Sequence, residues 1–184
     1  MRKIITTTFV TLDGVMQAPG GPEEDVGGFA NGGWSVNYWD GTMGKVMNGL
    51  MDLPFELLLG RRTYDIFAAH WPKAKDDEAV AVKFNSTRKY GVSHEPRELV
   101  WANSTLITGA VVPELQALKQ QVGPDLWVHG SGNLIQTLVA NQLVDRMHIW
   151  TFPITVGAKG KRFFAEGTLA ATESSRLSSA VRAP

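Results

Sequence analysis

The amino-acid sequence predicts an α/β protein whose central β-sheet is mostly parallel. Short stretches rich in Ile, Val, Thr and aromatic residues alternate along the chain with stretches in which apolar residues recur at helical spacing. Glycine-containing turns join two of these strand–helix pairs. The 184 residues, of which 43% are hydrophobic, suit one hydrophobic core. We therefore predict a single domain over residues 1–184.

The first part of the chain begins with a predicted strand over residues 2–12, rich in Ile, Thr, Phe and Val. Residues 13–34 contain seven glycines and two prolines, which predict a long loop of the kind that is usually functional or mobile. A helix follows, with five apolar residues on one face: Met43, Val46, Met47, Leu50 and Met51. Pro54 helps to end this helix.

The rest of the chain continues the alternation of strands and helices. We predict a strand over 55–59, a helix over 63–69 and an irregular polar segment over 70–87. Further strands are predicted over 89–93, 98–108, 125–129 and 146–157. Pro113 and Gly123 stand where a helix prefers its first proline and its closing glycine. One more helix follows the turn at 130–132.

The composition excludes several function classes. The net charge is +0 and the isoelectric point is about 6.9, so no overall attraction to nucleic acid or to an anionic membrane is expected. The absence of cysteine excludes disulfides and zinc–cysteine sites and is compatible with a reducing cytoplasm. The polar residues near the start make a poor signal peptide, and no apolar run approaches the ~18 residues of a membrane span. We therefore predict a cytoplasmic protein.

The segment Gly60-Arg61-Arg62-Thr63 places two cations where an apolar strand ends and a helix begins. The start of a helix presents free N–H groups and the positive end of its dipole, and an arginine fork suits phosphate oxygens. Thr63 is a candidate N-cap or phosphate-facing hydroxyl. The segment predicts an anion site at the carboxyl edge of the sheet, and two solvated arginines are the alternative.

A second turn, Gly130-Ser131-Gly132, lies between a predicted strand and a predicted helix. Glycines in such a turn permit a diphosphate to approach the backbone. The fingerprint of a Rossmann dinucleotide-binding domain is incomplete, because Ile135 stands where the third glycine is required and Asp145 comes too early for the ribose-binding acid. The segment is thus a second phosphate-friendly turn, and two such turns in one sheet can hold a dinucleotide between them.

Three residues are candidates for acid–base chemistry or substrate contacts. Asp13, after the first strand, either forms part of a turn or touches a substrate or nicotinamide. Asp40, before the methionine-rich helix, either caps that helix or acts on the substrate. His129 adjoins the second turn, where a packed histidine is favoured over a catalytic one. The other histidines show no metal-ligand spacing, so no metal site is predicted.

Several motifs occur together in one order: TLDG, LLLGRRTYD, KYGVS, WANSTLI, LKQQVGPDLWVHGSGNLIQTLVANQLVD and PITVGAKGKRFF. In this combination residues 2–166 resemble the dihydrofolate reductase-like proteins, in the branch similar to the C-terminal reductase domain of riboflavin biosynthesis. The resemblance implies a three-layer fold, with the sheet flanked by helices, and NADPH as hydride donor. The chain ends in ESSRLSSAVRAP where the family has a valine-rich strand, which predicts a truncated final strand and an exposed sheet edge.

The resemblance also implies which residues hold the cofactor. The family's Gly-Arg-x-Thr turn around the phosphates carries over to Gly60, Arg61, Arg62 and Thr63. Its late glycine turn around the diphosphate carries over to Gly130, Ser131, Gly132, Asn133 and Leu134. Ser93 matches the strand end on the adenosine side, and Leu12, Asp13 and Gly14 match the segment that flanks the nicotinamide.

By this resemblance we expect an NADPH-dependent oxidoreductase that transfers hydride to a small molecule. The alternatives for that substrate are a heterocycle, such as a pterin or a ribosylamino-pyrimidine, and a carbonyl compound. Asp13 or Asp40 would orient or protonate it, and the glycine-rich loop over 18–33 would act as a lid. A non-catalytic NADP(H)-binding sensor or assembly module is the rival interpretation. The exposed edge and the tryptophans favour a homodimer.

Overall fold

The structure is a computed structural model, and it describes residues 1–22, 24–25, 27–74, 79–157, 159–164 and 168. Its strands are β1 (Ile4–Thr11), β2 (Phe55–Gly60), β3 (Lys89–Val92), β4 (Ser104–Ile107), β5 (Asp125–His129) and β6 (Arg146–Phe152). Its α-helices are α1 (Gly41–Met51), α2 (Arg61–His70), α3 (Ala79–Ser86), α4 (Val111–Gln120) and α5 (Gly132–Ala140). Two short 3-10 helices, η1 (Val36–Tyr38) and η2 (Trp71–Lys73), complete the order.

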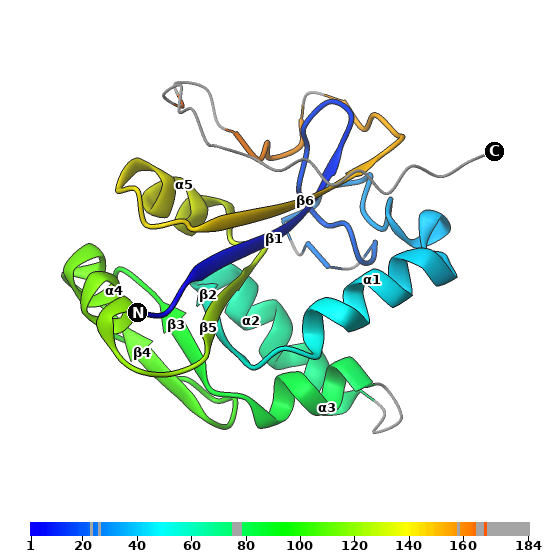
Figure 1. The fold of residues 1–184 in the computed structure, drawn as a ribbon. Coiled ribbons are helices and arrows are strands. Elements are labelled where there is room, and N and C mark those ends of the chain that lie inside the picture. The colour runs from blue at the N-terminus through cyan, green and yellow to red at the C-terminus, as the bar shows by residue number, and fades with distance from the viewer. Residues whose placement is uncertain (23, 26, 75–78, 158, 165–167, 169–184) are drawn as a thin grey trace.

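The six strands form one sheet in the order β4-β3-β2-β5-β1-β6. Every pair of neighbouring strands within it runs parallel. Helices α1, α2 and α3 lie on one side of this sheet, and α4 and α5 lie on the other (Figure 1). The protein is therefore a three-layer α/β structure with a parallel central sheet, as the sequence predicts.

Strand β2 lies at the centre of the packing, because its apolar run faces helices on both sides. Leu57, Leu58 and Leu59 are all fully buried. Leu57 and Leu59 belong to the cluster that packs against α2 and α3, whereas Leu58 belongs to the cluster under α4 and α5. This continuous apolar run is typical of a parallel strand that is covered on both faces. We call these two sides of the sheet the α1 face and the α5 face.

Most of the predicted elements are confirmed, one is wrong, and two strands are shorter than predicted, since the strand predicted over 146–157 ends at Phe152 as β6. The segment 70–87, which the sequence predicts to be irregular, contains η2 and the helix α3. This helix is only 8 residues long, and its amphipathic pattern is weak because it buries only Ala81 and Phe84. The strand predicted over 98–108 covers only Ser104–Ile107. Residues before it form a loop held by the hydroxyl of Tyr64, which accepts a 2.9 Å hydrogen bond from the Trp101 backbone N–H.

The methionine-rich helix is present but buries less than the sequence predicts. Within α1 only Met47 is buried, Leu50 and Met51 are partly buried, and Val46 is exposed. Strand β6 forms one edge of the described sheet. The expectation of a truncated final strand falls on residues after 168, outside the part of the chain that the structure describes.

Candidate functional site

The two glycine-containing turns follow neighbouring strands whose connecting helices lie on opposite faces of the sheet. Strands β2 and β5 are neighbours in the sheet. From β2 the chain continues through α2 on the α1 face, and from β5 it continues through α5 on the α5 face. The carboxyl ends of two such strands frame the crevice where open parallel sheets bind ligands. The fold therefore places the predicted phosphate turns side by side at the usual ligand position.

Hydrogen bonds join the two turns directly. The backbone N–H of Gly60 donates to the hydroxyl of Ser131 at 3.0 Å, and the backbone N–H of Ser131 donates to the hydroxyl of Thr63 at 3.1 Å. Gly130 and Ser131 have positive φ values of 52° and 60°, a conformation that is easy for glycine and costly for other residues. This strained backbone allows the chain to turn sharply enough for the reciprocal contact.

The first turn of α2 is open to an anion. Gly60 is the N-cap, and no side chain of the described residues caps this helix. Thr63 is therefore not the N-cap that the sequence allows, because it lies three residues further along and contacts Ser131. Uncapped N–H groups and the helix dipole both favour a negative charge at this point. The observed geometry thus fits phosphate oxygens.

Arg61 and Arg62 begin α2, and a third arginine that the sequence pattern did not indicate, Arg97, reaches the same helix. Arg61 is 54% exposed and stands 3.8 Å from Asp65, and Arg62 is also exposed. Arg97 makes a two-point contact with the Asp65 carboxylate, at 3.0 and 2.6 Å. The hydrogen bond to Asp65 raises the pKa of Arg97, so its charge is secure. Only the fold brings Arg97, from the loop after β3, to the first turns of α2.

The other predicted cofactor residues surround these turns. Ser93 directly follows β3, whose Val92 pairs with Gly60, so Ser93 is next to the start of α2. Its hydroxyl accepts from the backbone N–H of Glu95 at 3.3 Å. In the first turn of α5, Asn133 is exposed and Leu134 is buried. The structure thus brings the predicted phosphate and adenosine residues to one edge of the sheet.

Asp13 is held by three hydrogen bonds. Its carboxylate accepts from the Thr11 hydroxyl at 2.5 Å, from the Gly157 N–H at 2.8 Å and from the Val156 N–H at 3.3 Å. The Thr11 bond, supported by these backbone bonds, lowers the pKa of Asp13. Asp13 therefore stays ionised and ties the end of β1 to the segment after β6. Of its two neighbours in the predicted nicotinamide segment, Leu12 is exposed and Gly14 has a positive φ of 78°.

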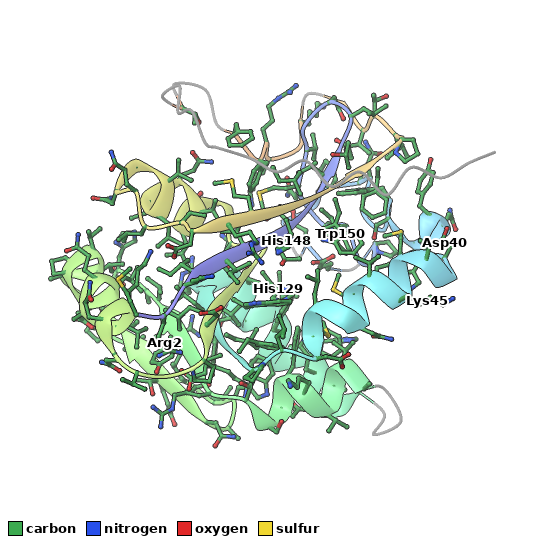
Figure 2. All side chains as sticks on the ribbon, in the orientation of Figure 1. Arg2, Asp40, Lys45, His129, His148 and Trp150 are labelled. Carbon is green, nitrogen blue, oxygen red and sulfur yellow. The ribbon has the colours of Figure 1, made fainter. Side chains whose placement is uncertain are left out.

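Asp40 is the N-cap of α1, which confirms the capping interpretation. Its Oδ1 accepts from the backbone N–H groups of Thr42 and Met43, both at 2.9 Å. The helix itself, GTMGKVMNGLM, contains no acidic residue. Figure 2 shows Asp40 at the beginning of α1, away from His129 and His148. Its catalytic role stays a prediction.

A row of polar side chains crosses the α1 face below the turns. Thr7 of β1 pairs with His129 of β5 on one side and with His148 of β6 on the other. Burial lowers the pKa of His129 to about 4, and burial together with Arg146 lowers the pKa of His148. His129 is therefore neutral at pH 7. Figure 2 shows both histidines on the side of the strands that faces α1.

Aromatic rings continue this face toward the carboxyl ends of β1 and β6. Phe9 lies 5.8 Å from Trp150, 5.2 Å from Phe152 and 6.2 Å from Trp39, measured between ring centroids. Tyr38 lies 6.0 Å from Phe152. We call these five residues the aromatic wall. It provides flat apolar surface next to the polar row.

The glycine-rich loop is fastened to the segment after β6 at both of its ends. The Asn31 side chain donates to the Val156 carbonyl at 3.0 Å, and Gln17 Oε1 accepts from the Lys161 N–H at 2.9 Å. Val15 also forms a β-bridge with Arg162. Lid motion of the loop stays a prediction. Any such motion must either break these contacts or be confined to the residues between them.

The described residues contain no group of three or more His, Cys, Asp or Glu side chains placed to hold a metal ion. None of the helices in that part of the chain combines the length and apolar character needed to cross a bilayer.

Comparison with known proteins supports this fold. Over 168 residues, the chain is 26% identical to the uncharacterized protein YyaP of Bacillus subtilis (strain 168), covering 90% of this chain and 81% of that one. A putative riboflavin biosynthesis protein from Shewanella sp. PV-4 superposes with a TM-score of 0.60 at 23% identity, over 89% and 84% of the two chains. Dihydrofolate reductase from Enterococcus faecalis, in complex with NADP(H) and RAB-propyl, gives a TM-score of 0.54 at 13% identity, over 89% and 77%. The model of the RibD C-terminal domain matches residues 2–182, and the chain therefore belongs to the RibD C-terminal domain family.

Proposed function

We propose that this protein is an NADPH-dependent reductase. The observation that carries the proposal is the junction of the two turns, in which the uncapped start of α2 and the positive-φ turn after β5 form one unit through Gly60 and Ser131. A dinucleotide requires two adjacent phosphate positions, and this junction provides them at the switch point of the sheet. The RibD C-terminal domain family and the dihydrofolate reductase-like fold support a nicotinamide cofactor.

In this proposal the chain's own residues bind and orient the cofactor. The N–H groups at the start of α2 and the turn at 130–132 hold the diphosphate. Arg61 and Arg62, which are exposed beside it, neutralise phosphate charge and read the 2′-phosphate that distinguishes NADPH from NADH. Arg97 braces Asp65 and thereby limits how strongly that carboxylate competes for Arg61. Ser93 lies on the adenosine side.

When bound, the cofactor supplies the hydride, and the protein supplies its position and surroundings. The acceptor is a small heterocycle of the pterin or pyrimidine kind, or a carbonyl compound. Asp13 anchors the segment that flanks the nicotinamide, and Asp40 fixes the start of α1, so both act on the substrate through position. The loop over 18–33 covers the site and excludes water.

A non-catalytic NADP(H)-binding module is the second candidate. It is favoured by the engagement of both predicted catalytic carboxylates, since Asp40 accepts hydrogen bonds from backbone N–H groups at the start of α1 and Asp13 accepts them from the segment after β6. The sensor would keep the same cofactor residues and bind no reducible substrate.

We also propose a cytoplasmic homodimer that uses the β6 edge. Ile149 and Phe164 are exposed there, beside an open hollow of about 350 Å³ that both residues line. An exposed strand edge with apolar neighbours is a pairing site unless a partner covers it. Light scattering of the purified protein tests this, and a monomeric mass at micromolar concentration would contradict it.

Thermal-shift measurements with NADPH, NADH, NADP+ and ATP test the cofactor proposal. A ligand at about 100 times its Kd stabilises the folded state by about 2.7 kcal/mol. We expect a clear rise in Tm with NADPH and a smaller rise with NADH. An unchanged Tm with both would contradict the reductase and the sensor together. A rise with NADPH, without oxidation of NADPH by dihydrofolate or by carbonyl compounds, would favour the sensor.

A further inference from the structure

The carboxylate of Asp65 lies between two arginines from different parts of the chain. Asp65 belongs to α2, four residues after Arg61, and Nη1 of Arg61 stands 3.8 Å from its Oδ2. Nη1 of Arg97, from the loop after β3, donates to the same Oδ2 at 3.0 Å, and Nη2 of Arg97 donates to Oδ1 at 2.6 Å. Arg97 therefore makes the closer, two-point contact with this carboxylate.

The geometry decides which arginine holds the carboxylate. A planar guanidinium that meets both carboxylate oxygens forms a strong ion pair, whereas a single contact near about 4 Å between exposed groups contributes little. The side chain of Arg97 is 30% exposed and that of Arg61 is 54% exposed, so a bound anion reaches Arg61 more freely. Asp65 is thus paired with Arg97, and the guanidinium of Arg61 stays available.

The loop that carries Arg97 is also fixed by contacts other than this ion pair. The hydroxyl of Tyr64, a buried residue of α2, accepts from the backbone N–H of Trp101 at 2.9 Å. The side chain of Leu99 packs against Gly91 of β3, where an added Cβ would lie 3.1 Å from Leu99 Cδ1. Loss of the ion pair should therefore change the local charge without releasing the loop.

The position of Asp65 is unfavourable for the proposed cofactor. The 2′-phosphate of NADPH is a phosphate monoester, which carries a charge of about −1.5 to −2 at pH 7. Arg61 and Arg62 face it in the proposed function, but Asp65 stands one helical turn further along the same helix. A carboxylate at that place repels the phosphate and attracts Arg61. Arg97 offsets this charge because it occupies both carboxylate oxygens.

We propose that Asp65 and Arg97 together set the preference of this site for NADPH over NADH, with Asp65 acting against the 2′-phosphate and Arg97 neutralising Asp65. The inference rests on the proposed function and adds the residues that determine its cofactor specificity. Arg97 is a positioning residue, because it acts through Asp65 and leaves Arg61 free for the phosphate. NADH has a hydroxyl in place of the 2′-phosphate, so the pair affects its binding much less.

A purely structural role of the same ion pair makes a different prediction. If the pair only braces the loop against α2, removal of either partner breaks the same contact and weakens cofactor binding alike. If the pair sets the charge at the phosphate position, removal of Asp65 and removal of Arg97 change NADPH affinity in opposite directions. Single substitutions at the two positions therefore separate the two roles.

The variants Asp65→Asn and Arg97→Gln and the double variant test the proposal, with the Kd values for NADPH and NADH measured by fluorescence titration. Both side chains are partly exposed, so the variants should fold, and thermal melting checks this. We expect D65N to bind NADPH about threefold tighter and R97Q about fivefold weaker, which is the range of exposed ion pairs. The double variant should lie within about twofold of the wild type, and the Kd for NADH should change less than about twofold in every variant.

Glu98→Gln is the matched control for the loss of one negative charge. Glu98 directly follows Arg97 in the same loop and is exposed, but it forms no ion pair with any described residue. We expect E98Q to change the Kd for NADPH less than about twofold. A tightening equal to that of D65N would indicate a general effect of charge and overturn the role of Asp65.

The outcomes separate this inference from the cofactor proposal. Weaker NADPH binding in both D65N and R97Q would assign the pair a bracing role, and it would overturn the inference while the cofactor proposal stands. Unchanged NADPH affinity in both variants would do the same. Equal changes in the Kd values for NADPH and NADH would also overturn the inference, because the 2′-phosphate would then not be involved. A wild type that binds neither nucleotide would overturn both proposals.

Discussion

The backbone N–H of Gly60 donates a 3.0 Å hydrogen bond to the hydroxyl of Ser131, although the two residues are 71 positions apart. Through this contact the end of β2 and the end of β5 are built as one structure. The two turns also pack closely here, since a Cβ added at Gly60 would lie in van der Waals contact, at 3.5 Å, with the Cβ atoms of Ser131 and Leu134. The stability of the fold and the shape of the proposed phosphate site therefore depend on the same pair of residues.

Replacement of Ser131 by Ala should weaken both properties. The Gly60 N–H would lose its acceptor, and we expect the free energy of unfolding to fall by about 1–2 kcal/mol, because an unpaired backbone N–H is costly. Affinity for NADPH should fall severalfold. Urea denaturation and fluorescence titration measure the two effects. Ser86→Ala is the control, since its exposed hydroxyl only donates to the Lys83 carbonyl within α3. If the two variants have the same free energy of unfolding and the same affinity for NADPH, the Gly60–Ser131 contact contributes to neither property.

Replacement of Arg61 and Arg62 by Ala should discriminate between the two nicotinamide cofactors. A charge-assisted hydrogen bond to phosphate contributes about 1.5–3 kcal/mol, so we expect at least a tenfold loss of NADPH affinity. NADH, which lacks the 2′-phosphate, should lose much less. Arg88→Ala is a matched control, because Arg88 is also exposed but directly precedes β3 at the opposite edge of the sheet. If the affinities for NADPH and NADH fall by the same factor, neither arginine reads the 2′-phosphate.

Replacement of Gly160 by Ala should disturb the fastening of the glycine-rich loop. A Cβ on Gly160 would overlap Cγ1 of Val15, closer than any real contact. We expect the free energy of unfolding to fall by about 1–3 kcal/mol, which is typical of overpacking. The double variant Val15→Ala with Gly160→Ala should recover part of the loss. Gly49→Ala in α1 is the control, since nothing lies within 4 Å of its added Cβ, and it should be neutral or stabilising by about 0.5–1 kcal/mol. A stable G160A protein would contradict the close packing.

The buried His129 should make stability depend on pH in a defined window. Burial lowers its pKa from 6.5 to about 4 in the folded state, so the unfolded state binds a proton first as the pH falls. Its contribution is complete above pH 6.5 and is lost between pH 6.5 and about 4. At ~1.36 kcal/mol for each pH unit, the loss amounts to about 3 kcal/mol.

Urea denaturation between pH 7 and pH 4 measures this effect as the difference between the wild type and His129→Leu. The variant should have the shallower dependence, because it lacks this titrating group. Parallel curves for the wild type and H129L would contradict the burial argument.

Much of the fold can be predicted from local sequence. The apolar run of β2, the alternation around β5 and the helix between Pro113 and the following glycine all satisfy simple patterns, and each is present. The pattern fails where tertiary contacts replace local preference. Helix α3 has few apolar anchors of its own and is held by the packing of Phe84 against Phe55 and Phe67. Val46 has helical spacing, but α1 leaves it exposed.

The proposed site likewise contains some residues that the sequence identifies and others that only the fold brings together. Gly60, Arg61 and Ser131 can be found from the sequence, because turns that end a strand and begin a helix have a recognisable composition. Arg97 gives no such signal, since its relation to α2 exists only through Asp65. Thr7 and His148 look like ordinary strand residues until the register aligns them with His129.

The sequence by itself determined the parallel α/β class, the position of the two glycine-containing turns and the cations beside one of them, because backbone propensity and turn chemistry act over a few residues. Only the tertiary structure decided that the two turns touch, that Asp40 caps a helix, and that Thr7 and His129 share one face with unpaired polar atoms. Strand order and register set these relations, and both depend on burial of side chains that are distant in the chain.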